Sequence, residues 1–457
     1  MKAAFHTLGC KVNQYETEAI KEAFVSRGAE IAGEDEFADV YVINTCTVTN
    51  IADRKSRQFI RRAKRINPDA VIVVTGCYAQ VAADEVASMP EVDLVIGNAL
   101  KTEIADKAYT LYEKANAGDG EGKDSGGKEA YSHVLSYDEL TGYEDMGVVT
   151  SDESSMSRAY IKIEEGCNRF CSYCLIPYAR GRVRSRAPEQ VVAEAKALVE
   201  KGYKEIVLTG INTALYGTEP GFDFEREADE EGLSGMEAII KRIDSLDGEF
   251  RIRLSSLEPT VVDKDDVLKL LGYEKLCHHL HLSIQSGSDN VLSAMNRHYT
   301  RDEYLEIVKA LRDFDPHYGI TTDIIVGFPG ETEADFKDTL DVVRRAGFGK
   351  VHVFRYSPRK GTVGAKLGDK VPEEVKKTRS SALEETASKV AEEYIGGLAG
   401  TIQTVLIEEE EDGHMTGYTD SYVKVYINSE GAKPEPGTFC NVRITGAFKD
   451  GAMASPE

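Results

Sequence analysis

Short apolar runs alternate with amphipathic stretches over the first 112 residues of this chain. The amphipathic stretches have helical spacing, most clearly over Glu16–Arg27 and Asp53–Ile66. Alternation of strands and helices favours a parallel sheet of the doubly wound kind, so we expect residues 1–112 to form one such domain. Its predicted strands are Ala3–Leu8, Val40–Ile43, Val71–Thr75 and Leu94–Ile96.

A second alternating region begins at Arg158, after a Gly-rich, polar stretch without periodicity. We interpret residues 113–155 as a flexible linker or insertion and residues 156–385 as a second domain. Six strand–helix units predict an open, partial (β/α)6 barrel, whose chemistry lies at the C-terminal ends of the strands. The six predicted strands are Ala159–Ile163, Glu205–Leu208, Arg251–Leu254, His279–Ile284, Thr321–Val326 and Lys350–Tyr356.

The pattern changes again after a charged helical segment, Pro372–Tyr394. Short strands at regular spacing between Thr401 and Phe448 predict a small β-barrel, which we assign to residues 386–452. The chain has no apolar run long enough to span a membrane, and its N-terminus lacks the features of a secretory signal. We therefore expect a cytoplasmic protein with no membrane partner.

The formal net charge of −23 would by itself argue against a nucleic-acid partner. Two local basic clusters change this picture, because phosphate contacts depend on local patches. The first cluster shares one predicted helix, where ordinary surface solvation would explain part of it, and the second follows a cysteine-rich loop. The clusters are Arg54, Lys55, Arg57, Arg61, Arg62, Lys64 and Arg65, and Arg180, Arg182, Arg184 and Arg186.

Three cysteines, Cys167, Cys171 and Cys174, follow the first strand of the second region with the spacing C-x3-C-x2-C. No fourth cysteine or histidine is close in sequence. A zinc site that borrows a distant ligand is one interpretation. The favoured one is a 4Fe–4S cluster with one iron that has no protein ligand. That iron can chelate S-adenosylmethionine, which the reduced cluster then cleaves to a carbon radical.

Three further cysteines, Cys10, Cys46 and Cys77, each come just past a predicted strand of the first domain. The corresponding ends of parallel strands share one edge of a sheet, so the three can converge on one point. We expect a second 4Fe–4S cluster there, with buried structural cysteines as the alternative. The other two cysteines, Cys277 and Cys440, are interpreted as packing residues.

The segment "CHHLHL" places two histidines, His279 and His281, on one face of a predicted strand. Histidines that line a barrel are the simpler interpretation, and a metal site is the alternative.

The stretch "EEGCNRFCSYCLIPYARG" resembles the signature of the radical S-adenosylmethionine methylthiotransferases. The stretches "TLGCKVNQYE", "VINTCTVT" and "VVTGCYAQ" are similar to the N-terminal domain of this family, whose auxiliary cluster handles the sulfur. The resemblance implies an α/β fold: a doubly wound N-terminal domain, a central partial (β/α)6 radical S-adenosylmethionine barrel and a C-terminal TRAM barrel. It also implies two 4Fe–4S clusters, S-adenosylmethionine and a low-potential electron donor.

The family resemblance also suggests which residues hold the cosubstrate. Tyr173 matches the aromatic residue expected beside the adenine of S-adenosylmethionine, and Gly210 lies in a weak glycine motif after the second strand, where a plain loop is the alternative. Stretches after the fourth and fifth strands match family segments that contact the cosubstrate. Their expected polar contacts are Gln285, Ser286, Arg297 and Asp323.

Family members that act on RNA add a methylthio group at C2 of a modified adenosine in the tRNA anticodon loop, where a base can be splayed out. The TRAM segment resembles an RNA-binding barrel, with a structural cap as the alternative. The stretch "GCKVNQYE" resembles the branch that acts on N6-threonylcarbamoyladenosine at position 37 of tRNA. We expect an arginine among Arg180–Arg186 to bind the threonyl carboxylate.

Three alternative functions stay open at this point. Within the family, one branch modifies N6-isopentenyladenosine of tRNA and another modifies an aspartate of a ribosomal protein. A non-catalytic iron–sulfur sensor that binds RNA is the alternative from another class of protein.

Overall fold

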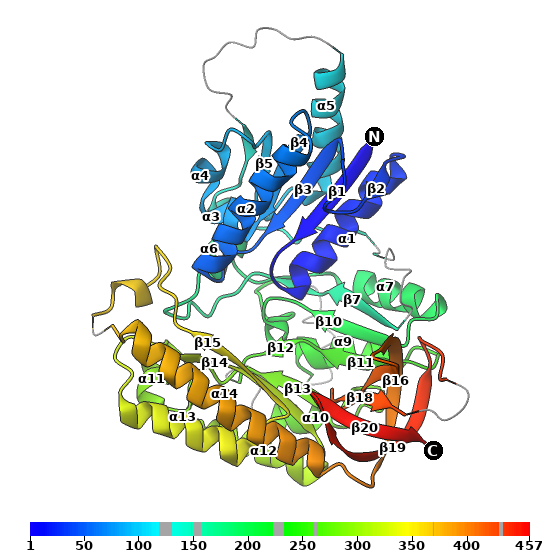
Figure 1. The fold of residues 1–457 in the computed structure, drawn as a ribbon, viewed down its shortest axis with the longest axis vertical. Helices are drawn as coiled ribbons and strands as arrows, with labels where there is room; N and C mark the ends of the chain where they lie inside the picture. Colours follow the sequence, from blue (N-terminus) through cyan, green and yellow to red (C-terminus); the bar gives the residue numbers. More distant parts are fainter. Residues whose placement is uncertain are drawn as a thin grey trace. The chain divides into compact units, whose positions relative to one another are not determined.

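The computed structural model describes residues 1–117, 130–147, 149, 157–222, 233–259, 264–368, 370–428 and 433–457, and the chain divides into two compact units (Figure 1). Unit 1 comprises Met1–Ser151, Glu164–Phe170 and Cys174–Arg186. Unit 2 comprises Asp152–Ile163, Cys171–Tyr173 and Ala187–Glu457.

Unit 1 is built on a six-stranded sheet in the order β2-β1-β3-β4-β5-β6, in which all pairs are parallel. The strand order reverses between β1 and β3, which is where open α/β sheets bind ligands. The doubly wound sheet predicted from the sequence is confirmed. The strands are β1 Lys2–Thr7, β2 Glu30–Ala32, β3 Val40–Thr45, β4 Val71–Gly76, β5 Leu94–Ile96 and β6 Tyr131–His133.

Helices cover both faces of this sheet, which is why its central strands β3 and β4 are buried at every position. In β3, Val40 and Val42 pack toward the core that includes Phe24 of α1, while Tyr41 and Ile43 pack on the core beneath α2. One core is formed with α1 Lys11–Ser26 and α5 Ile104–Asn116, and the other with α2 Asn50–Ile66, α3 Cys77–Val81 and α4 Ala83–Ala87. The short 3-10 helix η1, Lys101–Glu103, precedes α5.

The segment 113–155, expected to be a flexible linker or insertion, has regular structure in several of its described residues. Helix α5 continues to Asn116, β6 pairs with β5 at the edge of the sheet, and the 3-10 helix η2 follows at Tyr137–Glu139. The side chain of Gln80 donates a 2.7 Å hydrogen bond to the carbonyl of Leu135 and holds this segment on the sheet. The sequence pattern missed β6 because all three of its residues are exposed.

Unit 1 also contains the polypeptide that surrounds the C-x3-C-x2-C motif. The short strands β8, Glu164–Glu165, and β9, Arg184–Ser185, pair antiparallel. Helix α6, Ile176–Arg180, lies between them in the chain and has Pro177 in its first turn, where a missing N–H costs nothing.

The barrel of unit 2 has strands in chain order, β7-β10-β11 and then β12-β13-β14-β15, all parallel. Strands β11 and β12 are separated only by Ser255 and together form one of six strands in the barrel. The predicted partial (β/α)6 barrel is confirmed. The strands are β7 Arg158–Lys162, β10 Glu205–Thr209, β11 Arg251–Leu254, β12 Ser256–Leu257, β13 His279–Leu282, β14 Gly319–Val326 and β15 Lys350–Arg355.

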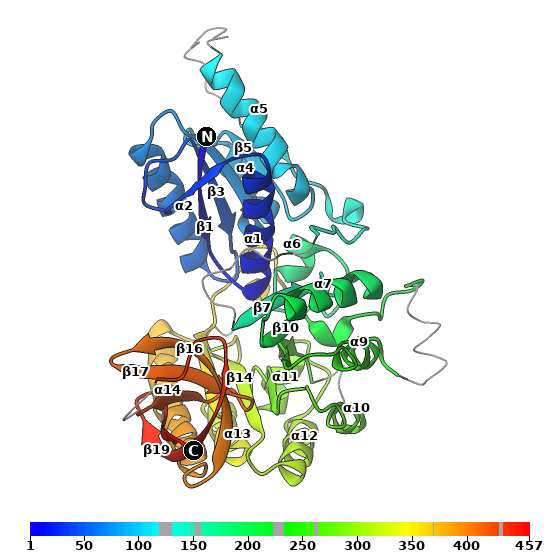
Figure 2. The ribbon, with the colours of Figure 1, turned by 90° about the vertical axis from the view of Figure 1, so that its right-hand side faces the viewer.

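Amphipathic helices pack their apolar faces on these strands, and Figure 2 shows α7, α9, α10 and α12 following one another along the outside. Capping boxes at Thr300 and Thr332 fix the starts of α12 and α13. The helices are α7 Pro188–Glu200, α9 Gly235–Asp244, α10 Lys264–Leu270, α11 Asp289–Ala294, α12 Arg301–Phe314, α13 Glu333–Ala346 and α14 Glu373–Gly396, with 3-10 helices η3 Thr213–Leu215 and η4 Gly364–Lys366.

The C-terminal part of unit 2 is a closed five-stranded barrel in the order β16-β17-β18-β20-β19. Four of its strands match the predicted ones. The sequence pattern missed β20, "GAMASP", because small residues and a proline replace the usual alternation of large apolar and polar side chains. The strands are β16 Ile402–Glu411, β17 His414–Thr419, β18 Lys424–Ile427, β19 Phe439–Phe448 and β20 Gly451–Pro456.

The turn between β17 and β18 packs against the N-terminal ends of the larger barrel's strands. Arg253 of β11 donates hydrogen bonds to the carbonyls of Thr419 and Asp420, at 3.1 and 2.8 Å. A Cβ at Gly319, the first residue of β14, would lie 2.0 Å from the carbonyl oxygen of Ser421. This turn therefore caps the larger barrel. The C-terminal domain thus has the role of a structural cap, which the sequence offered as an alternative to RNA binding.

Among the residues that the structure describes, no helix combines the length and the apolar character needed to cross a bilayer.

Candidate functional site

Cys10, Cys46 and Cys77 lie at the C-terminal ends of three neighbouring strands of unit 1. Cys10 is the N-cap of α1, which follows β1. Cys46 comes directly after β3, and Cys77 is the first residue of α3, directly after β4. Because β1, β3 and β4 are adjacent and parallel, the three cysteines share one edge of the sheet, as the sequence predicted.

The packing around Cys46 shows how closely these cysteines approach one another. Gly9 has a φ of +114°, and a Cβ there would lie 3.1 Å from the Cys46 sulfur, so the residue before Cys10 must be glycine. Burial, together with negative charge on Cys77 and Cys10, raises the pKa of the Cys46 thiol to about 12. Such mutual repulsion needs thiols that lie near one another.

These residues fit a thiolate-bound metal cluster. All three cysteines are free thiols, and thiolates that are crowded together become stable when a cation binds them. Two N–H donors point at the Cys77 sulfur, from Arg180 Nε at 3.3 Å and from Asn98 Nδ2 at 3.6 Å. Hydrogen bonds to ligand sulfurs are typical of iron–sulfur sites.

The Arg180 side chain is completely buried in unit 1. Its Nη1 donates to Glu16 at 2.9 Å and to Glu165 at 2.7 Å, and its Nη2 donates to Asn13 at 2.6 Å. Lys101, also buried, pairs with Glu16. Two cations and two carboxylates therefore balance each other next to the cysteine site.

The basic cluster after the radical motif is mostly internal. Arg184 donates to the carbonyls of Leu140 and Gly142, and Arg186 pairs with Asp145 at 2.9 Å. Only Arg182 among the four arginines of the cluster is exposed, and its guanidinium lies 5.7 Å from the ring centre of Tyr137. The expectation of a basic RNA-facing patch here is wrong for the three buried arginines.

The C-x3-C-x2-C loop is divided between the two units. In unit 1, the Cys167 N–H donates to the carbonyl of Gly181 at 3.1 Å, and the Cys174 sulfur accepts from the Ile176 N–H at 3.4 Å. In unit 2, Ser172 anchors the part that holds Cys171, because its N–H donates to the carbonyl of Met295 at 3.0 Å. Hydrogen bonds thus fix this loop at Cys167, at Ser172 and at Cys174.

Two of the predicted cosubstrate residues are in contact within unit 2. Arg297 Nη2 donates a 2.8 Å hydrogen bond to the hydroxyl of Tyr173, and its Nη1 pairs with Glu258 at 2.9 Å. Asn212 donates to the same carboxylate at 3.0 Å. The sequence reasoning missed Glu258 and Asn212, although each follows the end of a barrel strand, which is the signal that could have found them.

Gln285 and Asp323 form a second contact. The Gln285 N–H donates to the Asp323 carbonyl at 2.9 Å, and Gln285 has a left-handed φ of +68°, a conformation that non-glycine residues adopt mainly where function or packing demands it. Ser286 does not join this group, because its hydroxyl lies 3.4 Å from that of Thr339 on α13. Gly210 directly follows β10.

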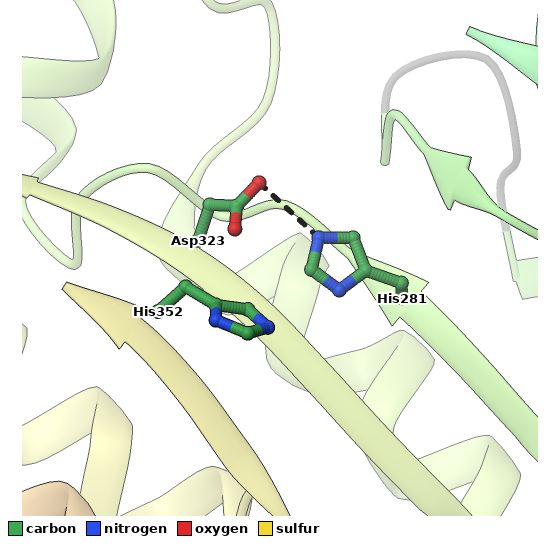
Figure 3. A group of neighbouring side chains, drawn as sticks. All are labelled: His281, Asp323 and His352. Atoms are coloured by element: carbon green, nitrogen blue, oxygen red, sulfur yellow. Dashed lines mark hydrogen bonds and ion pairs between the residues drawn. The ribbon is translucent and has the colours of Figure 1, made fainter. Parts of the chain in front are cut away.

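The Asp323 side chain belongs to a His–Asp–His group on three adjacent strands, with His281 on β13 and His352 on β15 (Figure 3). His281 Nε2 lies 3.2 Å from the carboxylate. Burial raises the pKa of Asp323, but hydrogen bonds from His281 and Ser283 lower it more, so the net shift is downward. The three ligand atoms lie within 4.8 Å of one another, close enough to hold a metal ion.

The two histidines of "CHHLHL" share one strand face as predicted. His279 Nε2 and His281 Nδ1 lie 3.0 and 2.9 Å from the Thr321 hydroxyl. The His279 ring packs against Tyr422 of the small barrel, 4.9 Å between ring centres. His279 therefore has a packing role, whereas His281 interacts with Asp323. Cys277 is buried, in agreement with its predicted packing role.

Comparison with family models finds three matches along the chain. Residues 2–97 match the "Uncharacterized protein family UPF0004", residues 161–343 match the radical SAM superfamily, and residues 398–449 match the TRAM domain. The order of these matches follows the order of the three domains expected from the sequence.

Solved structures share the fold at low sequence identity. The radical S-adenosylmethionine methyltransferase TsrM from Kitasatospora setae, with tryptophan and a cosubstrate analogue bound, is 13% identical with a TM-score of 0.56, over 80% of this chain and 75% of that one. The cobalamin-dependent S-adenosylmethionine radical enzyme OxsB is 13% identical with a TM-score of 0.52, over 85% of this chain and 56% of that one.

Curated proteins match over almost the whole chain. The threonylcarbamoyladenosine tRNA methylthiotransferase MtaB of Bacillus subtilis is 41% identical over 96% of this chain and 93% of its own length. The MtaB protein of Aquifex aeolicus is 39% identical over 97% and 100%, and a tRNA-2-methylthio-N6-dimethylallyladenosine synthase of Clostridium novyi is 35% identical over 96% and 93%. The chain therefore belongs to the radical S-adenosylmethionine methylthiotransferases of the MtaB type.

Proposed function

We propose that this chain adds a methylthio group to C2 of N6-threonylcarbamoyladenosine in tRNA. The observation that carries the proposal is the full-length similarity to MtaB proteins, 41% in Bacillus subtilis and 39% in Aquifex aeolicus. The chain also contains two sets of three cysteines, one for the cluster that generates the radical and one for the cluster that handles the sulfur. Relatives that are named as dimethylallyladenosine synthases are 34–35% identical, which makes the isopentenyl substrate the second candidate.

Two 4Fe–4S clusters are part of the proposal. Cys10, Cys46 and Cys77 would hold the auxiliary cluster, and Cys167, Cys171 and Cys174 would hold the catalytic one, each leaving one iron without a protein ligand. When bound, the clusters and S-adenosylmethionine supply the radical and the methylthio group, which acid–base groups of a protein cannot provide. The spacing C-x3-C-x2-C and the shared strand edge of the other three support this assignment.

We assign cosubstrate binding to the polar groups at the strand ends of unit 2. Arg297 fixes the Tyr173 ring through its hydroxyl, and Glu258 in turn orients Arg297. The backbone of Gln285 and the carboxylate of Asp323 offer polar groups nearby in the fold, and Gly210 allows a close approach after β10. Ser286 would act only through the turn that it stabilises.

The tRNA partner would be contacted through α2 rather than through the TRAM domain alone. The exposed side chains Arg54, Lys55 and Arg65 lie on α2, which starts at Asn50, shortly after Cys46 in the sequence. Residues 398–449 carry eight acidic and four basic side chains, so phosphate attraction to that domain is weak. We propose that α2 binds the backbone of the anticodon loop, whose unstacked base reaches the clusters.

Exposed aromatic and apolar side chains of unit 1 support a nucleic-acid base as the partner. Phe170 and Tyr178 are 37% and 47% exposed and lie in edge contact, with ring centres 5.9 Å apart. Val48 and Ile51, close in sequence to Cys46, are more than half exposed. Aromatic side chains that remain open to solvent are typical of single-stranded RNA binding, where bases stack on them.

Arg182 is our choice for the cation that binds the threonyl carboxylate. The other three arginines of its cluster are buried and bonded to internal partners, whereas Arg182 is exposed in the loop that follows α6. A guanidinium matches a carboxylate with two parallel hydrogen bonds. A low-potential electron donor and a cytoplasmic location without a membrane partner complete the proposal.

The test is mass spectrometry of tRNA nucleosides from cells with and without the gene. We expect loss of the methylthio form of threonylcarbamoyladenosine alone. Loss of the methylthio isopentenyl form instead would favour the second candidate. Unchanged nucleosides together with loss of a modified aspartate on a ribosomal protein would identify the protein-modifying branch. No change in either, and no cleavage of S-adenosylmethionine by the reduced protein, would indicate a non-catalytic sensor.

A further inference from the structure

Two helices of unit 1 that begin at cysteine motifs are joined to each other. Helix α3 starts with Cys77, and α6 starts two residues after Cys174. The side chain of Asn98 connects them, because its Nδ2 donates to the carbonyl of Ala179 on α6 at 2.8 Å and lies 3.6 Å from the Cys77 sulfur. The last residue of α6 is Arg180.

Arg180 makes the shorter contact with that sulfur. Its Nε donates to Cys77 Sγ at 3.3 Å, while the outer two nitrogens of the guanidinium are held by Glu16, Glu165 and Asn13. The five N–H groups of arginine lie in one plane with a fixed geometry. Three fixed partners on Nη1 and Nη2 therefore leave the Nε–H bond pointing in one direction, toward Cys77.

The surroundings explain why this buried cation is tolerated. An unpaired buried guanidinium would be strongly destabilising, but Glu16 and Glu165 each lie within 3 Å of it. Arg180 balances only one of these two negative charges, and Lys101, which pairs with Glu16, balances the other. The group is neutral overall, so Arg180 influences Cys77 mainly through a directed hydrogen bond and not through an uncompensated charge.

We propose that Arg180 is a positioning residue of the auxiliary cluster: its Nε–H bond to Cys77 sets the reduction potential of that cluster and ties α6 to the Cys77 helix. This inference rests on the cluster assignment of the proposed function. A donor at a ligand sulfur stabilises the more negative, reduced state of a cluster. Loss of the bond should make reduction harder, and the potential should become more negative.

The test uses full-length protein in which Cys167, Cys171 and Cys174 are replaced by alanine, so that only the auxiliary cluster remains. Its reduction potential is measured by a dye-mediated titration followed by electron paramagnetic resonance. Arg180→Gln removes both the donor at this position and the charge. Arg180→Lys keeps the charge beside Glu16 and Glu165 but removes the planar Nε donor. The matched control is Arg182→Gln, which removes an exposed charge from the same loop.

We expect both Arg180 variants to hold about four iron atoms per chain and to shift the potential to more negative values, with the control unchanged. If Arg180→Gln does not fold, Arg180→Lys decides the question alone. A potential equal to that of the parent in Arg180→Lys overturns the inference, and so does an equal shift in the Arg182 control. A parent protein that binds no cluster at all would instead refute the cluster assignment of the proposed function.

Discussion

Arg297 donates a 2.8 Å hydrogen bond to the hydroxyl of Tyr173, the aromatic residue that immediately precedes Cys174. Arg297 is itself fixed by Glu258, at 2.9 Å. An arginine far along the chain thus holds the ring of a residue inside the cysteine motif. The ring can serve as a rigid surface for the adenine of the cosubstrate because its orientation is set before the cosubstrate binds.

Replacing Tyr173 by phenylalanine should weaken binding of S-adenosylmethionine about tenfold. The variant keeps the ring but leaves a buried donor of Arg297 without its acceptor, at a cost of about 1.5 kcal/mol. Anaerobic equilibrium dialysis of the reconstituted protein measures the affinity. Tyr112→Phe, on α5 of unit 1, is the matched control. Equal affinities of the Tyr173 variant and the native protein would argue against this role.

Replacing Arg182 by glutamine should lower kcat/KM for tRNA that carries threonylcarbamoyladenosine by about 10- to 100-fold, since a charge-assisted hydrogen bond is worth about 1.5–3 kcal/mol. The selectivity for this tRNA over tRNA with unmodified adenosine should fall by the same factor. Competition between the two tRNAs in one reaction measures the ratio directly. A loss of rate with unchanged selectivity would assign Arg182 to general RNA binding.

Replacing Arg54, Lys55 and Arg65 of α2 by glutamine should weaken tRNA binding and make it less dependent on salt. Each lost phosphate contact lowers the slope of log K against log salt by about 0.7 for single-stranded RNA, so three contacts give about 2. Filter binding at several salt concentrations measures the slope. Lys309→Gln, an exposed change on α12, should leave the slope as it is. An unchanged slope in the triple variant would exclude α2 as the RNA contact.

Replacing Glu205 by glutamine should destabilise unit 2 by about 3–5 kcal/mol, because a buried charge network loses the carboxylate that pairs with three arginines. The carboxylate accepts hydrogen bonds from Arg251 at 2.7 Å and from Arg253 at 2.8 Å, and it also pairs with Arg158 of β7. Two of these arginines also bond the turn of the TRAM barrel. Urea unfolding of the variant and the native protein measures the difference.

The difference in stability between the Glu205→Gln variant and the native protein should depend on pH. Burial by itself raises the pKa of Glu205, but the three arginines lower it far more, so the pKa lies well below its usual value. A carboxylate with a lowered native pKa contributes stability above its unfolded pKa of about 4.3 and loses it as the pH falls toward the native pKa. The stability difference should therefore be constant from about pH 8 to 5 and shrink in stronger acid. A difference that grows on acidification would contradict this account.

The sequence predicted the parts of the fold whose burial leaves a pattern. In the large barrel, strands such as β11 and β13 alternate polar and apolar residues. Strands β3 and β4 of unit 1 are instead apolar at nearly every position, because helices cover both faces of their sheet. The positions of Cys10, Cys46 and Cys77 at strand ends followed from that pattern alone. By contrast, β6 has three exposed residues and β20 consists mostly of small ones, so neither leaves a signal of this kind.

The side-chain network around the cysteines could not be predicted in the same way. In the sequence, Arg180 is the first of four arginines at alternate positions, a pattern that predicts a basic surface cluster with Arg182, Arg184 and Arg186. Its partner Glu16 lies 164 residues away in sequence, and a charge looks the same in the sequence whether it faces water or a buried carboxylate. The strand-end position of Glu258 is visible in the sequence, but its pairing with Arg297 is a contact that only the fold creates.

The most direct test of the account is the iron and acid-labile sulfide content of the anaerobically reconstituted chain. The account predicts about eight iron atoms per native chain, and about four after alanine replaces either Cys10, Cys46 and Cys77 or Cys167, Cys171 and Cys174. A native chain that binds only about four, or a triple variant that retains about eight, would contradict the assignment of two clusters.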